Sequence, residues 1–335
     1  MTHDVIIVGA GVAGLQAALT LSSLGIRPLV LERESAAGGK VRDWHNLFPS
    51  FTPTDEVLGP MLKAVTGSDV EIRYGAAVSK VTDKGVELGS GENIAAKAVI
   101  LATGYDIFDA TIKEEYGYGL YDNVITSVDL ERMITGGGVT TTTGRAPQNI
   151  ALLHCVGSRD EKVCQRHCSR VCCIVGVKQA IELKKLFPAA NIHNFYMDIR
   201  MFGPGYEELY RQAQIEYNID FVRGRISEAS QTIDGRVQIK AEDTLVGRPL
   251  KMTVDMLVLL VGMKAPAQNQ AFAATKGIEL LPSGFLAPRD PFAGNVSSNL
   301  PNVFYAGAVT APKNIGESMS EGAAAATKAY QYLRA

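Results

Sequence analysis

Short apolar runs alternate with longer stretches of helical periodicity at both ends of the chain. The run DVIIV lies almost at the start, and a second apolar run at 28–31 follows a stretch with helical spacing. This alternation is typical of parallel sheets covered by helices. The elements predicted at the two ends are strands at 4–8, 28–31 and 98–101, and helices at 15–24 and about 317–330.

The middle of the chain repeats the pattern. A strand, a long helix and a second strand are expected in succession, which is a βαβ unit, and the sheet is expected to continue beyond it. A run of glycines and threonines before this unit predicts a loop or linker. The predicted strands are 149–154, 192–197, 236–240 and 255–261, the helix is 171–187, and the linker is 136–143.

The first predicted turn contains a glycine fingerprint. Gly9, Gly11 and Gly14 stand between the first strand and its helix. The first glycine permits a tight turn, the second lets backbone approach a pyrophosphate, and the third lets the helix pack on the strand. Glu32 ends the second strand, where an acid meets a ribose hydroxyl. A glycine-rich turn without a ligand is the alternative, and the correct spacing of strand, helix and acid favours a dinucleotide site.

Further motifs resemble the flavoproteins with two dinucleotide-binding domains, of the thioredoxin and glutathione reductase kind. They are Gly38-Gly39-Lys40, Ala102-Thr103-Gly104 and the segment 302–307 before the last helix. The resemblance implies an α/β fold and FAD rather than NAD, with the last helix directed at the flavin pyrimidine. One departure is Ala308, where the family usually has an aspartate. The expected FAD residues are Gly9, Gly11, Gly14, Glu32, Arg33, Gly39, Lys40, Val78, Thr103, Gly104, Gly307, Ala308, Lys313 and Ile315.

The flavin motifs occupy both ends of the chain, so we expect an FAD domain assembled from both ends around an inserted domain. A chain of 335 residues also exceeds the usual size of one hydrophobic core. We place the FAD domain at 1–140 and 293–335 and the inserted unit, which resembles a nucleotide-binding domain, at 141–292. In that unit the first strand-to-helix turn holds cysteines where a nicotinamide domain would hold GxGxxG.

Composition excludes several classes of function. The net charge is −2, hydrophobic residues make up 46% of the chain, and no basic stripe suits nucleic acid. The first strand begins within four residues, which leaves no room for a signal peptide, and the longest apolar run, 256–263, is too short to cross a bilayer. We therefore expect a cytoplasmic protein without direct membrane insertion.

All five cysteines lie between Cys155 and Cys173, and an odd, clustered set in such a compartment argues against structural disulfides. The spacing of Cys164, Cys168 and Cys172 would put three sulfurs on one face of a helix, with Cys173 turned away. Inert buried thiols, tetrahedral zinc and an iron–sulfur cube are the alternatives. The flavin favours the iron–sulfur interpretation, because a closed zinc site beside it would carry no electrons.

Five stretches together look like the A subunit of heterodisulfide reductase. They are KEEYGYGLYDNVITS (113–127), CVGSRDEKV (155–163), CSRVCC (168–173), FYMDIRMFGPGYEELY (195–210) and PKNI (312–315). The resemblance implies a 4Fe-4S cluster held by Cys155, Cys168, Cys172 and Cys173, which leaves Cys164 as an extra thiol and disagrees with the helical stripe. It also implies that Lys178 lies near the flavin as a catalytic residue; a solvated helix lysine is the alternative.

The chain resembles the short form of that family, found in heterodisulfide reductase-like complexes of sulfur oxidisers or in quinone-interacting oxidoreductases. This implies a homodimeric FAD and 4Fe-4S electron-transfer subunit, with sulfur chemistry on partner subunits. Two other functions stay open. One is a self-contained pyridine-nucleotide disulfide reductase that uses Cys172 and Cys173 as a vicinal pair, and the other is a flavin or zinc assembly module without turnover.

Overall fold

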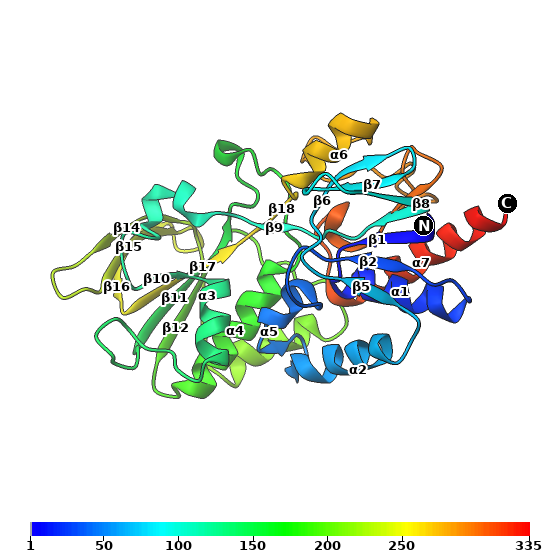
Figure 1. The fold of residues 1–335 in the computed structure, drawn as a ribbon. Coiled ribbons are helices and arrows are strands. Elements are labelled where there is room, and N and C mark those ends of the chain that lie inside the picture. The colour runs from blue at the N-terminus through cyan, green and yellow to red at the C-terminus, as the bar shows by residue number, and fades with distance from the viewer. Residues whose placement is uncertain (1) are drawn as a thin grey trace. The chain divides into compact units, whose positions relative to one another are not determined.

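The computed structural model describes residues 2–335, with the backbone alone at Lys276. Its internal contacts divide the chain into two compact units, and the pieces of each come from distant parts of the sequence. Unit 1 contains the residues up to Arg42, Thr54–Asp106 and Lys264–Ala335, and unit 2 contains Asp43–Pro53 and Ile107–Met263. Both units are α/β, as the apolar pattern predicts (Figure 1).

Unit 1 is built on a mixed sheet whose strand order is β5-β2-β1-β8-β7-β6, with β19 paired to β8. The neighbours of β1 are both parallel to it, which places the turn after β1 at the carboxyl edge of the sheet. The strands are β1 (Thr2–Val8), β2 (Leu29–Leu31), β5 (Glu71–Arg73), β6 (Val78–Thr82), β7 (Gly85–Leu88), β8 (Asn93–Leu101) and β19 (Val303–Tyr305), and the α-helices are α1 (Val12–Ser23), α2 (Thr54–Thr66), α6 (Gln268–Lys276) and α7 (Ile315–Arg334).

The two faces of this sheet have separate hydrophobic cores. Helices α1, α2 and α7 cover one face, and the core of the other face includes residues of α6 and of β6 and β7, which continue the sheet from the first residues of β8 (Figure 1). On the first of these faces helix α7 packs directly along α1. The last helix of the chain therefore belongs to the same unit as the first strand. Unit 1 thus contains segments from both ends of the chain.

Unit 2 contains a parallel sheet in the order β10-β17-β11-β12-β13 and an antiparallel sheet in the order β14-β15-β16. Helices α3, α4 and α5 pack on one face of the parallel sheet, and the antiparallel sheet shares a core with its other face (Figure 1). The elements are β3 (Asn46–Leu47), β4 (Thr52–Pro53), β10 (Val124–Thr126), α3 (Ser127–Thr135), β11 (Asn149–Val156), α4 (Cys172–Leu186), β12 (Asn191–Tyr196), α5 (Tyr206–Ile215), β13 (Asp220–Arg223), β14 (Ile226–Gln231), β15 (Val237–Asp243), β16 (Arg248–Val254) and β17 (Met256–Val261).

The expected elements occur with small shifts at their ends, but the units divide the chain at other places than the expected boundaries. The chain passes between the units after Arg42, after Pro53 and within the short strands β9 (Asp106–Ile107) and β18 (Met263–Lys264), rather than after residues 140 and 292. The reason is that β10 joins the unit 2 sheet beside β17, while α6 packs on β6 of unit 1. The stretch 136–143 is therefore a loop between α3 and β11 inside unit 2, and its interpretation as a linker was wrong.

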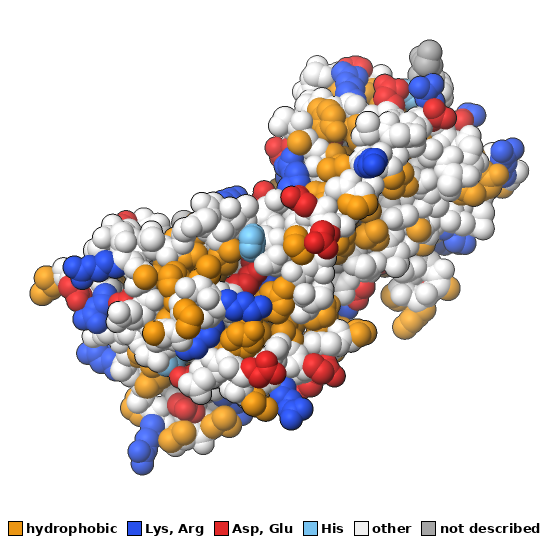
Figure 2. Space-filling model, turned by 90° about the horizontal axis from the view of Figure 1, so that it is seen from below, with side chains coloured by type: hydrophobic (Ala, Val, Ile, Leu, Met, Phe, Trp, Pro, Cys, Tyr) orange, Lys and Arg blue, Asp and Glu red, His pale blue; other side chains and the backbone are white. Residues whose placement is uncertain are grey.

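Most of the longest apolar run forms the buried strand β17, an inner strand between β10 and β11. Among residues 2–335 no helix combines the length and the apolar character needed to span a bilayer. On the face shown in Figure 2, acidic and basic side chains are interspersed with hydrophobic ones.

Candidate functional site

The glycine turn between β1 and α1 has little room at two of its three glycines. Gly9 has a φ of +103°, and a Cβ there would lie 2.6 Å from the carbonyl oxygen of Ala102. A Cβ on Gly14 would lie 1.9 Å from the carbonyl oxygen of Gly9. Both positions therefore require glycine for the fold itself, because the first needs a left-handed backbone and the second close packing of helix on turn.

Gly11 is different, because a Cβ there would meet protein only at Gly39 Cα, 4.0 Å away. Gly11 is also the N-cap of α1, and the structure shows no side-chain hydrogen bond at this cap. The hydroxyl of Thr103 is a buried polar atom without a recorded hydrogen-bond partner. An open position at a helix N-terminus and a buried hydroxyl at the end of the adjacent strand β8 both suit a phosphate group, so these residues fit a bound dinucleotide.

Glu32 is 6% exposed and lies directly after β2. Its two carboxylate oxygens accept hydrogen bonds from the backbone N–H groups of Ala10, at 2.6 Å, and Glu34, at 2.9 Å. These bonds hold the acid beside the glycine turn, where its remaining lone pairs suit a ribose hydroxyl. The other residues expected near this edge are placed as follows: Arg33 pairs with Glu34 on the surface, the Lys40 ammonium lies 5.0 Å from the Tyr105 ring centroid, and Val78 is buried at the start of β6.

The C-terminal motif folds into a hydrogen-bonded corner before α7. Gly307 donates its N–H to Glu321, at 3.1 Å, and the Lys313 ammonium donates to Thr310 Oγ1, at 2.6 Å. Ala308 is buried in the short turn that follows β19, and Ile315 is the first residue of α7. All of the residues predicted to bind FAD thus belong to unit 1.

The cysteines of unit 2 lie in the loop between β11 and α4 and at the adjoining ends of these two elements. Cys155 lies near the end of β11 with a φ of +61°, and α4 begins only at Cys172. Cys164 is exposed and has a left-handed backbone with a φ of 56°. The helical stripe of Cys164, Cys168 and Cys172 was therefore wrong, because the first two of these residues precede the helix.

Three of the thiols form a hydrogen-bonded chain in which Cys172 contacts both Cys155 and Cys173. The bond with Cys172 lowers the pKa of Cys173 to about 4 and that of Cys155 to about 7. The same two bonds, together with burial, raise the pKa of Cys172 well above its ordinary value. Ionised thiols are the form in which cysteine binds metals.

The surroundings of this loop suit an anionic group. Cys168 is half-buried, and its sulfur accepts a hydrogen bond from the Arg170 N–H, at 3.3 Å. Arg159 lies within electrostatic reach of Cys155 and Cys168, and its Nη1 is buried without a recorded partner. Among residues 2–335 there is no group of three or more His, Cys, Asp or Glu side chains arranged so that it could hold a metal ion. The four thiols have the soft-donor chemistry of an iron–sulfur site, and the partly buried guanidinium of Arg159 suits its negative charge.

A buried ionic network anchors the same loop to residues far away in sequence. Asp160 accepts hydrogen bonds from Lys113, at 2.8 Å, and Arg225, at 2.6 Å, and Arg225 also donates to the Tyr116 hydroxyl. Burial opposes ionisation of Asp160, but the two cations lower its pKa to about 2. Sequence reasoning missed this network, although Lys113 and Asp160 both lie in the stretches that resemble the family. The opposite charges of Lys113 and Asp160 were the one signal in the sequence that could have indicated this ion pair.

Lys178 is completely buried on α4, so its interpretation as a solvated helix lysine was wrong. Its ammonium lies 2.5 Å from Glu131 and 3.1 Å from Glu182, and it donates to the carbonyl oxygen of Asn46 at 3.0 Å. Burial raises the pKa of Glu182. Two buried carboxylates around one ammonium therefore fasten the 43–53 segment to unit 2, an arrangement that the sequence pattern did not predict.

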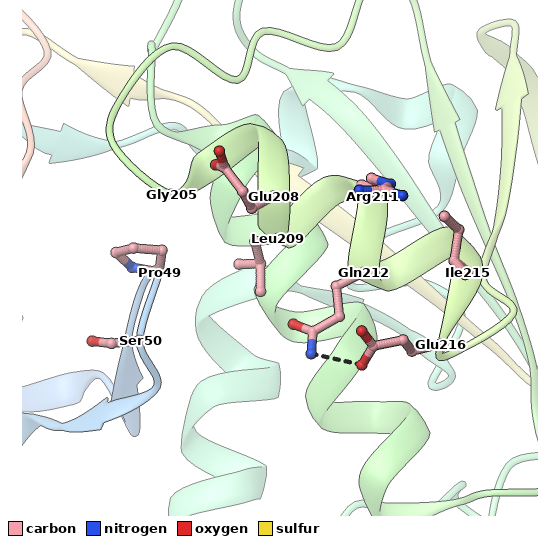
Figure 3. Close-up of a pocket in the computed structure, with 9 residues that line it drawn as sticks. All are labelled: Pro49, Ser50, Gly205, Glu208, Leu209, Arg211, Gln212, Ile215 and Glu216. Carbon is pink, nitrogen blue, oxygen red and sulfur yellow. Dashed lines mark hydrogen bonds between the residues drawn. The ribbon is translucent and has the colours of Figure 1, made fainter.

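An open pocket of about 540 Å³ lies between the 49–50 turn and α5 in unit 2 (Figure 3). Its lining contains both polar and apolar side chains, and Gln212 and Glu216 are hydrogen-bonded to each other at 2.9 Å. Neither a cysteine nor a residue of the glycine motifs lines it, so it is separate from both candidate sites. The lining residues are Pro49, Ser50, Gly205, Glu208, Leu209, Arg211, Gln212, Ile215 and Glu216.

Comparison with known proteins agrees with this geometry. A family model described as pyridine nucleotide-disulphide oxidoreductase matches residues 3–331. The chain is 31% identical to the iron–sulfur A subunit of the CoB–CoM heterodisulfide reductase of Methanocaldococcus jannaschii, over 96% of this chain and 63% of that protein. It is 40% identical to the A subunit of the H(2):CoB-CoM heterodisulfide,ferredoxin reductase of Methanothermobacter marburgensis, over 69% of this chain and 36% of that protein. The chain thus spans less than two thirds of the length of these relatives.

Solved structures with a similar fold are thioredoxin reductases. That of Lactococcus lactis has a TM-score of 0.71 at 20% identity, with 99% of both chains covered. That of T. acidophilum has a TM-score of 0.70 at 19% identity, with 98% of this chain and 97% of the other covered. The expected flavoprotein fold with two dinucleotide-binding domains and the expected oxidoreductase class are confirmed. The chain belongs to the pyridine nucleotide-disulphide oxidoreductase family and is a homologue of the A subunit of heterodisulfide reductase.

Proposed function

We propose that this chain is an FAD and 4Fe-4S electron-transfer subunit of a heterodisulfide reductase-like complex. One observation carries the proposal. The strand-to-helix turn between β11 and α4 of unit 2, where a second nucleotide would bind, is a long loop, and three hydrogen-bonded thiols lie on the strand and helix that flank it. The glycine turn of unit 1 keeps its open position at Gly11.

The residues of unit 1 would hold the FAD. The α1 N-terminus and Gly11 would receive the pyrophosphate and Glu32 a ribose hydroxyl, and Lys313 and the α7 N-terminus would face the flavin pyrimidine. A bound flavin supplies two-electron and one-electron chemistry in one group. The proposed FAD set is Gly9, Gly11, Gly14, Glu32, Arg33, Gly39, Lys40, Val78, Thr103, Gly104, Gly307, Ala308, Lys313 and Ile315.

In unit 2 we propose that Cys155, Cys168, Cys172 and Cys173 would hold the cluster. Cys155 and Cys173 are the thiols whose pKa is lowered, and Cys172 is hydrogen-bonded to both. Backbone N–H groups already donate to the sulfurs of Cys168 and Cys173. Hydrogen bonds to sulfur are one of the ways in which proteins set the potential of iron–sulfur centres. We assign Lys178 as the residue of α4 that acts near the flavin, held in one orientation by Glu131 and Glu182.

The partners are proposed from the relatives, whose names make them subunits of heterodisulfide reductases. We propose that the chain works as a homodimer beside other subunits of such a complex in dissimilatory sulfur metabolism, and that partner subunits carry out the sulfur chemistry. Five free thiols suit a reducing compartment, so we place the protein in the cytoplasm.

Anaerobic purification followed by iron, sulfide, zinc and flavin assays tests this function. We expect stoichiometric FAD together with iron and sulfide, and a broad absorbance shoulder beside the flavin bands. Flavin without iron would contradict the electron-transfer function and support a simple reductase. Zinc in place of iron would contradict it as well and support an assembly module without turnover.

A second function is favoured by one contact. The hydrogen bond between Cys172 and Cys173 is compatible with a vicinal dithiol, which a self-contained pyridine-nucleotide disulfide reductase would use. We expect NADH to reduce the flavin of the isolated chain slowly or not at all, because the unit 2 turn lacks a glycine loop for a nicotinamide nucleotide. Rapid stoichiometric bleaching by NADH in stopped flow, without partner proteins, would revive the reductase.

A further inference from the structure

The loop 197–205 after β12 contacts the cysteine site from outside. The thiol of Cys173 lies 3.8 Å from the carbonyl oxygen of Asp198, and the Arg200 backbone is hydrogen-bonded to the same sulfur. On the other side, Arg170 donates its N–H to Cys168, and its guanidinium lies 5.2 Å from the Phe202 ring centroid. A single layer of residues therefore separates two of the proposed ligands from the surface of unit 2.

This layer is rich in arginine. Arg159 donates to Asp198 at 2.7 Å, and an Arg223 nitrogen lies 3.8 Å from the other oxygen of that carboxylate. The bond from Arg159, with the charges of Arg200 and Arg223, lowers the pKa of Asp198. We call the set of Arg159, Arg170, Arg200, Arg223 and Phe202 the arginine face.

The arginine face has an excess of positive charge and an exposed aromatic ring. Arg159, Arg200 and Arg223 share one carboxylate, that of Asp198, so these three guanidinium groups outnumber it, whereas the chain as a whole has a net charge of −2. Phe202 is 58% exposed, and Arg200 and Arg223 are exposed as well. Local charge of this kind attracts an oppositely charged surface and raises its association rate, and aromatic and arginine side chains are enriched where proteins bind each other.

We propose that the arginine face is the docking surface for an acidic electron-transfer protein. The proposal rests on the proposed function, since the partner would exchange electrons through the layer over Cys168 and Cys173. A protein fits better than a nucleic acid, because the guanidinium groups converge on one carboxylate and one ring instead of forming a long basic track.

The test measures binding of an acidic bacterial ferredoxin, in its oxidised form, to the holo chain over a range of salt concentrations. The variant is Arg170→Glu/Arg223→Glu, which reverses two charges without changing a cysteine. The matched control is Arg248→Glu/Lys251→Glu, which reverses two exposed charges on β16 of the same unit. We expect the first variant to weaken binding at least ~10-fold at low salt and the control to change it little, with the difference disappearing as salt screens the charges.

Two further probes keep the result interpretable. A basic cytochrome should bind weakly to wild type, and a single-stranded DNA 20-mer should not show the same arginine dependence. Equal effects of the two variants, or tight binding of the cytochrome or the DNA through this face, would overturn the proposal.

Iron content and reduction potential separate this inference from the proposed function. If the arginines only balance the charge of a cluster, the Arg170→Glu/Arg223→Glu variant would lose iron or shift its potential while its ferredoxin affinity stays that of wild type, which would overturn the docking surface. Failure of the proposed function itself would appear as a holo chain without iron in every variant, the wild type included.

Discussion

The first strand-to-helix turns of the two βαβ frameworks differ in how their shape is maintained. In unit 1 the chain passes from β1 to α1 through Gly9–Gly11, and close backbone contacts together with one nearby side chain, Glu32, define the turn. In unit 2 the chain between β11 and α4 runs through residues 157–171, and side chains from other elements anchor it. The same framework thus presents backbone N–H groups in one unit and thiols in the other.

The anchors of the longer loop come from distant parts of the chain. Lys113 and Arg225 bind Asp160, and Asp198 binds Arg159. A short turn can be specified by glycines that need a particular backbone conformation, whereas a long loop requires contacts that resist its conformational entropy. Variants in each turn should therefore fail in different ways.

The largest effect is expected for Cys173→Ser. Cys173 is a buried thiol at the start of α4, and serine would offer a harder and more basic ligand in its place. The anaerobically purified variant should lose or convert its cluster, which iron and sulfide assays and the reduced-state EPR signal would reveal. Wild-type iron content and an unchanged signal would remove Cys173 from the ligand set.

Replacing Lys178 by methionine should come next. The change leaves Glu131 and Glu182 buried together without their ammonium and takes a donor from the Asn46 carbonyl oxygen. Breaking a buried ion pair in this way lowers the free energy of unfolding by about 3–5 kcal/mol. Urea unfolding of the variant and of wild type measures this loss of free energy of unfolding.

Lys185→Met on the same helix is the control, because Lys185 is exposed and lies 4.0 Å from the Phe51 ring centroid, a contact of about 1 kcal/mol or less. Adding Glu131→Gln to the Lys178→Met variant should restore part of the lost stability. Equal losses for the two lysine variants would show that the buried ion pairs contribute little.

Gly11→Val tests the shorter turn. The open space at Gly11 should let the apo fold tolerate the side chain, while the branched Cβ occupies the volume that the pyrophosphate needs. The variant should purify without FAD, and it should lose the about 2.7 kcal/mol of stabilisation that a ligand supplies at 100 times its Kd.

Gly14→Ala is the contrasting variant, since its Cβ would overlap the Gly9 carbonyl and destabilise the apo protein too. Flavin absorbance and thermal melting distinguish the two cases. A yellow Gly11→Val protein with normal flavin stoichiometry would show that this turn is not the phosphate site.

A smaller loss of folding stability is expected when the pH is lowered and Asp160 is protonated. The pKa of Asp160 is lowered from 3.8 to about 2 in the folded protein. Its stabilisation is therefore complete above the ordinary pKa and is lost as the pH falls through the folded value, a loss of about 2 kcal/mol. Asp160→Asn should remove this dependence, so the stability difference between wild type and variant should shrink toward pH 2 in urea titrations. A difference that stays constant with pH would mean that the network does not act through this carboxylate.

The sequence predicted the glycine turn better than the cysteine loop, and the reason is physical. Gly9, Gly14 and Glu32 act through neighbouring backbone, so their spacing alone indicates their roles. The pairing of Lys113 with Asp160 joins residues far apart in the chain and leaves no periodicity.

The helical stripe was wrong for a related reason. Spacing by four residues indicates a shared face only if the whole segment is helical, and the backbone has a positive φ at Cys164 and Arg170. The expected unit boundaries differ from those of the structure because pairing with β17 places β10 in unit 2 and packing on β6 places α6 in unit 1. Neither contact can be read from the local composition of the chain.

The smallest effect is expected for Cys164→Ser. Cys164 is exposed and lies outside α4, and its neighbour in the chain, Gln165, closes the loop by backbone hydrogen bonds with Asp160 instead of through the thiol. The variant should keep nearly all of its iron and its reduced-state EPR signal, and its unfolding free energy should stay within ~0.5 kcal/mol of wild type. Iron assays on Cys164→Ser and Cys173→Ser prepared side by side make the comparison direct. Loss of iron from Cys164→Ser with full occupancy in Cys173→Ser would sink the proposed ligand set, because the exposed loop would then supply a ligand that the buried helix start does not.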